Sequence, residues 1–116
     1  AAGIAQVHLQ QVRVEANQAK AGDALVLKRL ARASNPRSVQ HRVLLEGCFV
    51  LGGDDGVMID TEGVWLRKCD ISLAASRGIF ANFHFVIEDS TVRDCKSYGM
   101  KTRGGCQRLG KNDIQA

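Results

Sequence analysis

The sequence predicts an all-β fold, a short right-handed parallel β-helix of about five coils with 21–22 residues in each coil. Three observations predict it. Short alternating apolar segments recur at a fixed interval, glycines recur at the same interval, and Gly, Asp, Asn and Ser corners separate the segments. We expect one domain, 1–116, with a basic loop inserted at 28–42.

The repeat is clearest in four blocks of six residues: LEGCFV (45–50), LRKCDI (66–71), IEDSTV (87–92) and LGKNDI (109–114). Their first and last residues form two apolar columns: Leu45, Leu66, Ile87 and Leu109, then Val50, Ile71, Val92 and Ile114. A glycine follows each of the first three blocks, at Gly56, Gly78 and Gly99. Each of these glycines opens another short alternating segment.

Stacking explains why segments of this kind recur. A segment of three to five residues is too short to pair stably alone, and period-2 alternation turns one side inward. Copies stacked at about 4.8 Å hydrogen-bond to one another along the axis. The stretches VHLQQVRV (7–14) and GDALVL (22–27) fit the same scheme with a longer corner. Helices do not explain alternation with a corner every few residues.

These repeats resemble the right-handed parallel β-helices of pectate-lyase-like and related carbohydrate-binding or sugar-hydrolysing proteins. The resemblance covers about residues 7–115. It implies the fold. It leaves the activity open, because this fold hosts many functions.

Polygalacturonases on this fold suggest one catalytic hypothesis. Their aspartate motifs resemble Asp23 on one coil and Asp54-Asp55 on the next. An inverting hydrolase needs one carboxylic acid and one carboxylate of this kind. The family's third motif has histidine where this chain has Arg77, and Lys101 stands without the Arg-x-Lys pair. Asp before Gly also suits a structural corner, so we favour corners over a catalytic set.

Alternation also predicts which side chains face outward. Two outward rows are apolar: Val26, Met58 and Phe80, which Lys101 continues, and Leu44, Trp65 and Val86. Such rows usually mark interfaces. The alternatives are that the insert and the terminal segments cover them, or that Trp65 or Phe80 stacks on sugars within a polar fringe. A third outward row is mixed and should face solvent: Arg13, Phe49, Asp70, Thr91 and Asp113.

The net charge of +4 is concentrated in residues 28–42, KRLARASNPRSVQHR, which contain no acid. The cations of this basic loop are Lys28, Arg29, Arg32, Arg37 and Arg42. The loop is either simply solvated or docks against an acidic partner or an anionic surface. Nucleic acid is not an expected partner, because no aromatic residues are interleaved with the charges.

The cysteines predict no metal or cofactor. Cys48 and Cys69 continue into Ser90 and Asn112 as a column of small and polar residues. There is no C-x-x-C spacing, so we expect free thiols without zinc. No apolar run reaches the roughly 18 residues that span a bilayer. No signal peptide is visible, and the compartment stays open.

The sequence therefore favours a non-catalytic interaction or scaffold module, packed with other protein subunits in a larger assembly. Neither end resembles an amphipathic cap, which adds the expectation of a small docked subunit or a piece of a longer solenoid. The alternative is a fragment of a carbohydrate-active enzyme, a polygalacturonase-like hydrolase or a polysaccharide lyase, with a polysaccharide as partner. An enzyme predicts charged residues around Met58 and Phe80, whereas a scaffold predicts protein atoms packed on them.

Overall fold

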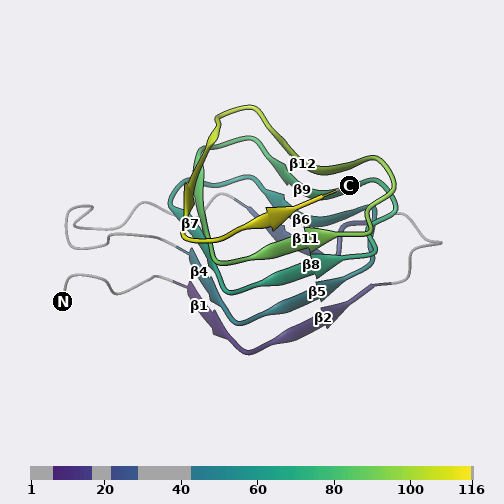
Figure 1. The fold of residues 1–116 in the computed structure, drawn as a ribbon, viewed down its shortest axis with the longest axis horizontal. Helices are drawn as coiled ribbons and strands as arrows, with labels where there is room; N and C mark the ends of the chain where they lie inside the picture. The colour runs from purple at the N-terminus through teal and green to yellow at the C-terminus, as the bar shows by residue number, and fades with distance from the viewer. Residues whose placement is uncertain (1–6, 17–21, 29–42, 116) are drawn as a thin grey trace.

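A computed structural model of the protein describes residues 7–16, 22–28 and 43–115. Within these ranges the regular structure consists of β-strands, and none of it is helical. The strands stack as rungs of a parallel β-solenoid, with β1 at one end and the last coil at the other (Figure 1). The predicted all-β class and the stacked coils are confirmed.

Three parallel sheets run along the solenoid. The first has the order β1-β4-β7-β10-β13, with β1 (Val7–Gln10), β4 (Val43–Glu46), β7 (Val64–Arg67), β10 (Phe85–Glu88) and β13 (Cys106–Leu109). The second comprises β2 (Arg13–Glu15), β5 (Phe49–Leu51), β8 (Asp70–Ser72), β11 (Thr91–Arg93) and β14 (Asp113–Ile114). The third comprises β3 (Leu25–Leu27), β6 (Asp55–Ile59), β9 (Arg77–Ala81) and β12 (Tyr98–Thr102).

Each full coil contributes one strand to each sheet. Three consecutive coils are described without a gap, and they contain β4 to β6, β7 to β9 and β10 to β12. The first coil includes segments outside the described residues, and the last coil has only β13 and β14. The expected number of about five coils is therefore corrected to about three full turns.

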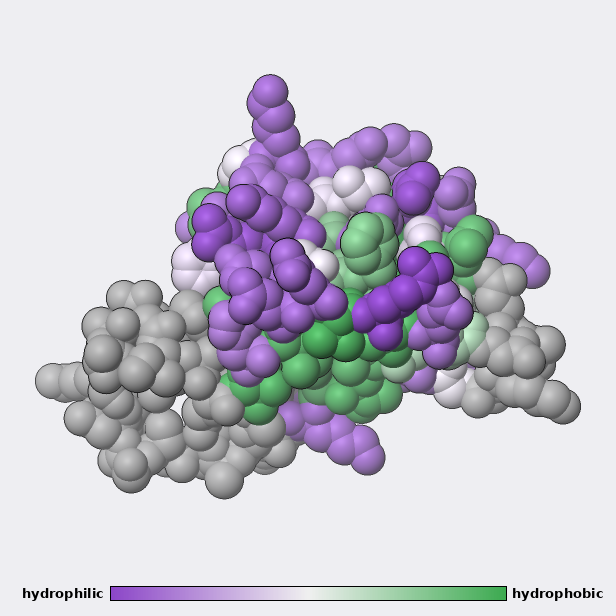
Figure 2. Space-filling view, turned by 90° about the horizontal axis from the view of Figure 1, so that it is seen from below, coloured by the Kyte–Doolittle hydropathy of each residue, from purple (hydrophilic) through white to green (hydrophobic). Residues whose placement is uncertain are grey.

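The first coil joins the stack as the sequence predicts. Strand β1 pairs with β4, β2 with β5 and β3 with β6, all in parallel. Figure 2 views the molecule from this end and shows hydrophobic surface at the centre, between hydrophilic residues. Val7, Leu9 and Leu25 of the first coil pack against the core but stay partly exposed.

The predicted register is confirmed at most positions. In the first sheet Leu45 pairs with Leu66, and Leu66 pairs with Ile87. In the second sheet one column continues through every coil: Val14, Val50, Ile71, Val92 and Ile114. These columns place branched apolar residues of successive coils directly above one another.

The assignment of Leu109 to the first column is wrong. Arg108 pairs with Ile87, and Leu109 pairs with Glu88, which lies on the opposite face of the strand from Ile87. Phe85 of β10 pairs with Cys106 of β13, and Val92 of β11 pairs with Ile114 of β14. The second pair is separated by one more residue in the sequence than the first. The extra residue lies in the corner after β13, so the column shifts by one position.

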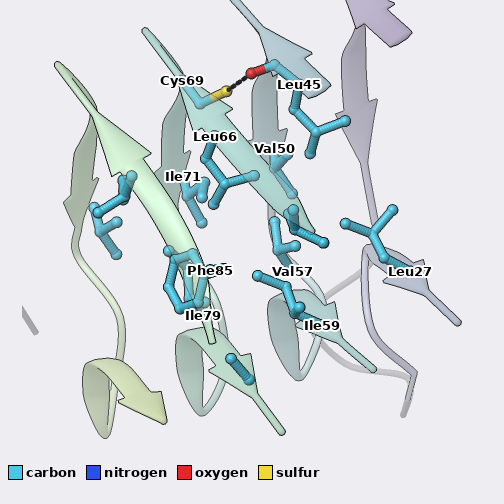
Figure 3. Packing of buried hydrophobic residues seen from close by; sticks show 14 of the residues in the cluster. Leu27, Leu45, Val50, Val57, Ile59, Leu66, Cys69, Ile71, Ile79 and Phe85 are labelled. Atoms are coloured by element: carbon cyan, nitrogen blue, oxygen red, sulfur yellow. Dashed lines mark hydrogen bonds between the residues drawn. The ribbon is translucent and has the colours of Figure 1, made fainter. Parts of the chain in front are cut away.

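Inward side chains from all three sheets meet in one apolar core, and Figure 3 shows them at close range. Phe85 is the largest of the fully buried side chains, and Leu66, Ile71 and Ile79 are also inaccessible to solvent. Full burial of one such side chain stabilises the fold by about 1.5–3 kcal/mol. The core therefore needs no outward residue to be complete.

The recurring glycines stack at the entrance to the third sheet, where Gly56, Gly78 and Gly99 follow one another from coil to coil. A Cβ on Gly56 would lie 2.7 Å from the carbonyl oxygen of Gly78, and one on Gly78 would lie 2.6 Å from that of Gly99. Contacts this short do not occur in real structures. This column requires glycine because the backbones of neighbouring coils approach so closely.

The column of small and polar residues forms a hydrogen-bonded ladder. The Cys69 N–H donates to Ser90 Oγ at 3.1 Å, and the Ser90 N–H donates to Asn112 Oδ1 at 2.9 Å. Cys69 Sγ donates to the carbonyl oxygen of Leu45 at 3.3 Å (Figure 3). The thiols of Cys48, Cys69, Cys95 and Cys106 are free, as predicted. Burial raises the pKa of the Cys69 thiol to about 11.

Candidate functional site

The three candidate aspartates meet at the corner that leads into the third sheet. Asp23 Oδ1 accepts a hydrogen bond from the Asp55 N–H at 3.1 Å, and Asp54 Oδ2 accepts one from the Gly22 N–H at 3.2 Å. The main chains are also bonded there, from the Ala24 N–H to the Asp55 carbonyl at 3.0 Å. Two of the carboxylates thus join the backbones of two neighbouring coils.

Asp55 is bound by Arg77 from the next coil. The Arg77 Nε and Nη2 atoms donate to the two carboxylate oxygens of Asp55 at 2.9 and 3.1 Å. Asp55 is only 5% exposed. A bidentate arginine compensates the charge of a buried carboxylate. Both oxygens of Asp55 are therefore occupied by a neighbouring side chain.

Asp23 experiences a different environment. Partial burial raises the pKa of the Asp23 carboxyl, and the negative charges of Asp55 and Asp54 raise it further. The hydrogen bond from the Asp55 N–H and the charge of Arg77 act in the opposite direction. The structure thus brings Asp23, Asp54, Asp55 and Arg77 together at one corner.

Lys101 lies elsewhere on the third sheet. Asp55, Arg77 and Tyr98 occupy one register column, whereas Lys101 pairs with Phe80 three positions further along the strand. The Lys101 Nζ atom lies 5.9 Å from the centre of the Tyr98 ring. Lys101 therefore lies outside the column of Asp55, in the outward row of Phe80.

That outward row has the predicted register. Val26 pairs with Met58, Met58 with Phe80, and Phe80 with Lys101. Val26 is 42% exposed, and Met58 and Phe80 are half-buried.

Two arginines lie over the ring of Phe80. The Arg77 Cζ atom is 4.0 Å from the ring centre, and the Arg103 Cζ atom is 5.6 Å from it. Charged residues thus surround Phe80, the feature that the carbohydrate-active alternative predicts. Sequence reasoning missed Arg103. The sequence offered only a weak signal, because Arg103 follows β12 directly in the bend after Thr102, where strand alternation no longer applies.

The outward row on the first sheet is also in register. Leu44 pairs with Trp65, Trp65 pairs with Val86, and all three are half-buried. The Trp65 Nε1–H donates to Glu88 Oε1 at 3.1 Å. Apolar surface and a charged acceptor therefore adjoin on this face.

A charged column runs beside the first-sheet row. Arg67 Nη1 donates to Glu46 at 3.2 Å, and Arg67 Nε lies 3.9 Å from Glu88. The His8 Nε2 atom lies 3.4 Å from Glu46. Sequence reasoning missed this polar fringe, although Glu46, Arg67 and Glu88 each lie two residues beyond a member of the outward row and so share its face. His8 pairs with Leu44 and therefore extends the row itself.

The remaining expectations concern the insert and the second sheet. Lys28 is exposed at the end of β3, while Arg29, Arg32, Arg37 and Arg42 lie outside the described residues. The mixed row is in register and partly or fully exposed, with Arg13, Phe49, Asp70, Thr91 and Asp113. A shallow hollow of about 410 Å³ adjoins this sheet, lined by Arg13, Glu15, Ala16, Leu51, Gly52 and Leu73.

The part of the chain that the structure describes holds no group of three or more His, Cys, Asp or Glu side chains suited to a metal ion. The same part contains no helix that is both long and apolar enough to cross a membrane.

Comparison with known proteins yields no relative: no family model matches the chain, no curated protein is similar to it, and no solved structure matches it. The β-solenoid is established by the strand pairing alone.

Proposed function

We propose that this chain is a non-catalytic β-solenoid interaction module, packed against other protein subunits in a larger assembly. One observation carries the proposal. The row Leu44, Trp65 and Val86 lies on the outer face of the first sheet, while the inward neighbours Leu45, Leu66 and Phe85 already fill the core. Covering these half-buried side chains with a partner would add only part of the roughly 1.5–3 kcal/mol that full burial of a large apolar side chain contributes.

The row on the third sheet supports the same proposal. Val26, Met58 and Phe80 form a second apolar strip on another face of the solenoid. Two strips on one small body suit a subunit with more than one neighbour. The basic loop at 28–42 is a secondary contact in this proposal, since its charge favours an acidic surface.

The contacts of Asp55 argue against a catalytic role for this residue. A carboxylate that activates water needs an oxygen free to receive a proton. Both oxygens of Asp55 accept from Arg77, which leaves Asp55 no oxygen for this role, while Asp54 and Asp23 each use one oxygen to accept from a backbone N–H. These bonds give all three side chains a structural role at the corner.

The second candidate is a fragment of a carbohydrate-active enzyme, and one observation favours it. Trp65 lies beside Glu88, and Arg77 and Arg103 lie over Phe80. An aromatic ring with a polar fringe suits a sugar, which presents both an apolar face and hydroxyl groups. Turnover of polygalacturonate that is lost in the double variant Asp54→Asn/Asp55→Asn would decide for this candidate.

The proposed module is tested by the mass of the native assembly. The protein is purified from its source at low salt, and its mass is measured by light scattering with and without Trp65→Ala. We expect Trp65→Ala to release the chain from its assembly while the melting temperature of the isolated chain changes little, because Trp65 does not fill the core.

Phe49→Ala is the matched control for this test. Phe49 is an aromatic residue that is 48% exposed on the mixed row of the second sheet. Its removal should leave the assembly intact. Equal masses for wild type and Trp65→Ala, or a chain that is monomeric in its source, would contradict the proposed function.

A further inference from the structure

The outer face of the third sheet gathers three cationic side chains around one aromatic ring. Arg77 and Arg103 lie over the ring of Phe80, and Lys101 occupies the neighbouring position of the same row. We call Arg77, Phe80, Lys101 and Arg103 the Phe80 cluster. Guanidinium groups over an aromatic face are held by cation–π attraction.

The positive charge of this cluster is only partly neutralised. Asp55 neutralises Arg77. Among the described residues no carboxylate forms an ion pair with Lys101 or Arg103, and both side chains are exposed. The nearby Asp60 lies two coils before Arg103 at the same corner, and the Asn82 side chain binds it at 3.2 Å. The cluster therefore has two cations free to bind an anion.

Apolar surface adjoins these cations. Met58 lies beside Phe80, and Val26 lies beside Met58 on the next coil. The face thus changes from aliphatic to aromatic to cationic along the solenoid axis, over neighbouring rungs that are about 4.8 Å apart. A ligand that covers this face needs both apolar groups and anionic groups.

We propose that this face binds an acidic segment of a partner protein. The segment's apolar side chains pack on Met58 and Phe80, and its carboxylates bind Lys101 and Arg103. This inference rests on the proposed function and specifies the partner of one of the two apolar strips, the one on the third sheet. Arg77, held by Asp55, orients the Phe80 ring rather than binding the partner directly.

The composition of the face favours a polypeptide over other anions. A polyuronate or another acidic polysaccharide has no apolar side chain to bury against Val26 and Met58. An anionic lipid surface is held by larger groups of cations, each worth about 1 kcal/mol near the surface. An extended peptide presents every second side chain to this face, so a segment whose facing residues change from apolar to acidic along its length matches the change along the solenoid axis.

The test measures peptide binding to the full chain by fluorescence anisotropy. The probe is a labelled heptapeptide with valine and phenylalanine in its first half and glutamate in its second half, and its counterpart carries lysine in place of each glutamate. We expect the acidic peptide alone to bind, with affinity that falls as salt rises. Lys101→Glu/Arg103→Glu should weaken binding at least about tenfold, since attraction becomes repulsion.

The matched control is Lys68→Glu/Lys111→Glu. Both lysines are exposed at corners between the first and second sheets, and this variant changes the net charge by the same amount. It should alter affinity less than about twofold at moderate salt, where remote charges are screened. Lys101→Gln/Arg103→Gln removes charge without reversing it, and binding should fall to an intermediate level.

Four outcomes would overturn the inference: no binding of the acidic peptide, equal binding of the lysine peptide, equal losses in the control, or tighter binding of polygalacturonate or of phosphatidylserine vesicles at matched charge. The proposed function is tested separately through Trp65. An assembly that Trp65→Ala disrupts while Lys101→Glu/Arg103→Glu leaves peptide binding unchanged would leave the module standing and reject this site.

Discussion

At the scale of single residues, the polar side chains at the corners mainly bind the backbone of a neighbouring coil. Asp54 binds the Gly22 N–H, and Asp89 accepts from the Lys111 N–H at 2.9 Å. The sequence placed the aspartates at corners correctly, because Asp and Gly together are typical of turns. It did not predict the partner of each carboxylate, since partners depend on side-chain directions across coils.

Asp23 gives the first prediction. Because burial and neighbouring carboxylates raise its pKa, its stabilising contribution is present below the unfolded value of 3.8 and is lost as pH rises through the folded value. Asp23→Asn keeps an acceptor for the Asp55 N–H and removes the charge. We expect the variant to equal or exceed wild type in urea midpoint at pH 7, with no difference at pH 3.

Asp113→Asn serves as the control for this pH comparison. Asp113 lies on the exposed second-sheet row. Its substitution should leave the urea midpoint unchanged at both pH values. A lower midpoint for Asp23→Asn at pH 7 would show that the negative charge of Asp23 stabilises the corner.

The ion pair of Arg77 gives the second prediction. Removing one partner of a fully buried ion pair costs about 3–5 kcal/mol. The Arg77 side chain is 25% exposed, so we expect Arg77→Ala to lower the free energy of unfolding by about 2 kcal/mol. Arg93→Ala, which removes an exposed pair with Asp70, should cost less than about 1 kcal/mol. Equal losses in urea unfolding would refute the structural role of the Asp55–Arg77 pair.

At the scale of elements, alternation and period were sufficient to predict the strands and most of the register. They failed at Leu109 for a physical reason. The last coil has one more corner residue, and the sequence does not show on which side of β13 it lies. Leucine resembles the apolar members of the column, but Arg108 occupies the inward position and is exposed at the end of the stack.

The thiol ladder gives the third prediction, which concerns alkaline pH. The Cys69 pKa is raised from 9.0 to about 11 by burial, so the stability that the protonated thiol contributes is present below pH 9 and is lost as pH rises through 11. We expect a loss of about 2 kcal/mol by pH 11. Serine is of similar size, can donate a hydrogen bond as the thiol does, and does not titrate in this range. The free energy of unfolding of Cys69→Ser should therefore lack this loss at alkaline pH.

Urea unfolding at pH 8 and pH 11 measures the alkaline effect as a difference between variants. Every other titratable group is common to wild type and Cys69→Ser, so its effect cancels in this comparison. Cys106→Ser is the control, because Cys106 is less buried than Cys69. This variant keeps Cys69 and should still lose stability at alkaline pH. An identical pH dependence in wild type and Cys69→Ser would contradict the prediction.

At the scale of the whole molecule, the three-sheet solenoid was predictable because one repeat dictates every coil. The surface was less predictable. The rows came from alternation, but the contacts of Trp65 with Glu88 and of Phe80 with Arg103 depend on how long side chains lean across the face. The insert at 28–42 breaks the repeat, so the repeat pattern predicts no strand pairing within it.

The stacked architecture gives the last prediction. In a solenoid each coil contacts only its neighbours, so one substitution should cost more between two coils than at an end. The second-sheet column offers a matched series, since Val14, Val50 and Val92 share chemistry and register but not burial. Val50 and Val92 are fully buried, whereas Val14 of the first coil is half-buried.

Val50→Ala and Val92→Ala should each lower the free energy of unfolding by about 2–3 kcal/mol. Val14→Ala should cost about 1 kcal/mol or less, because fewer atoms surround the cavity it leaves. Urea unfolding followed by circular dichroism measures all three, and strand propensity cancels because the same residues are exchanged. Equal losses at the three positions would mean that the first coil is covered as completely as the middle of the stack.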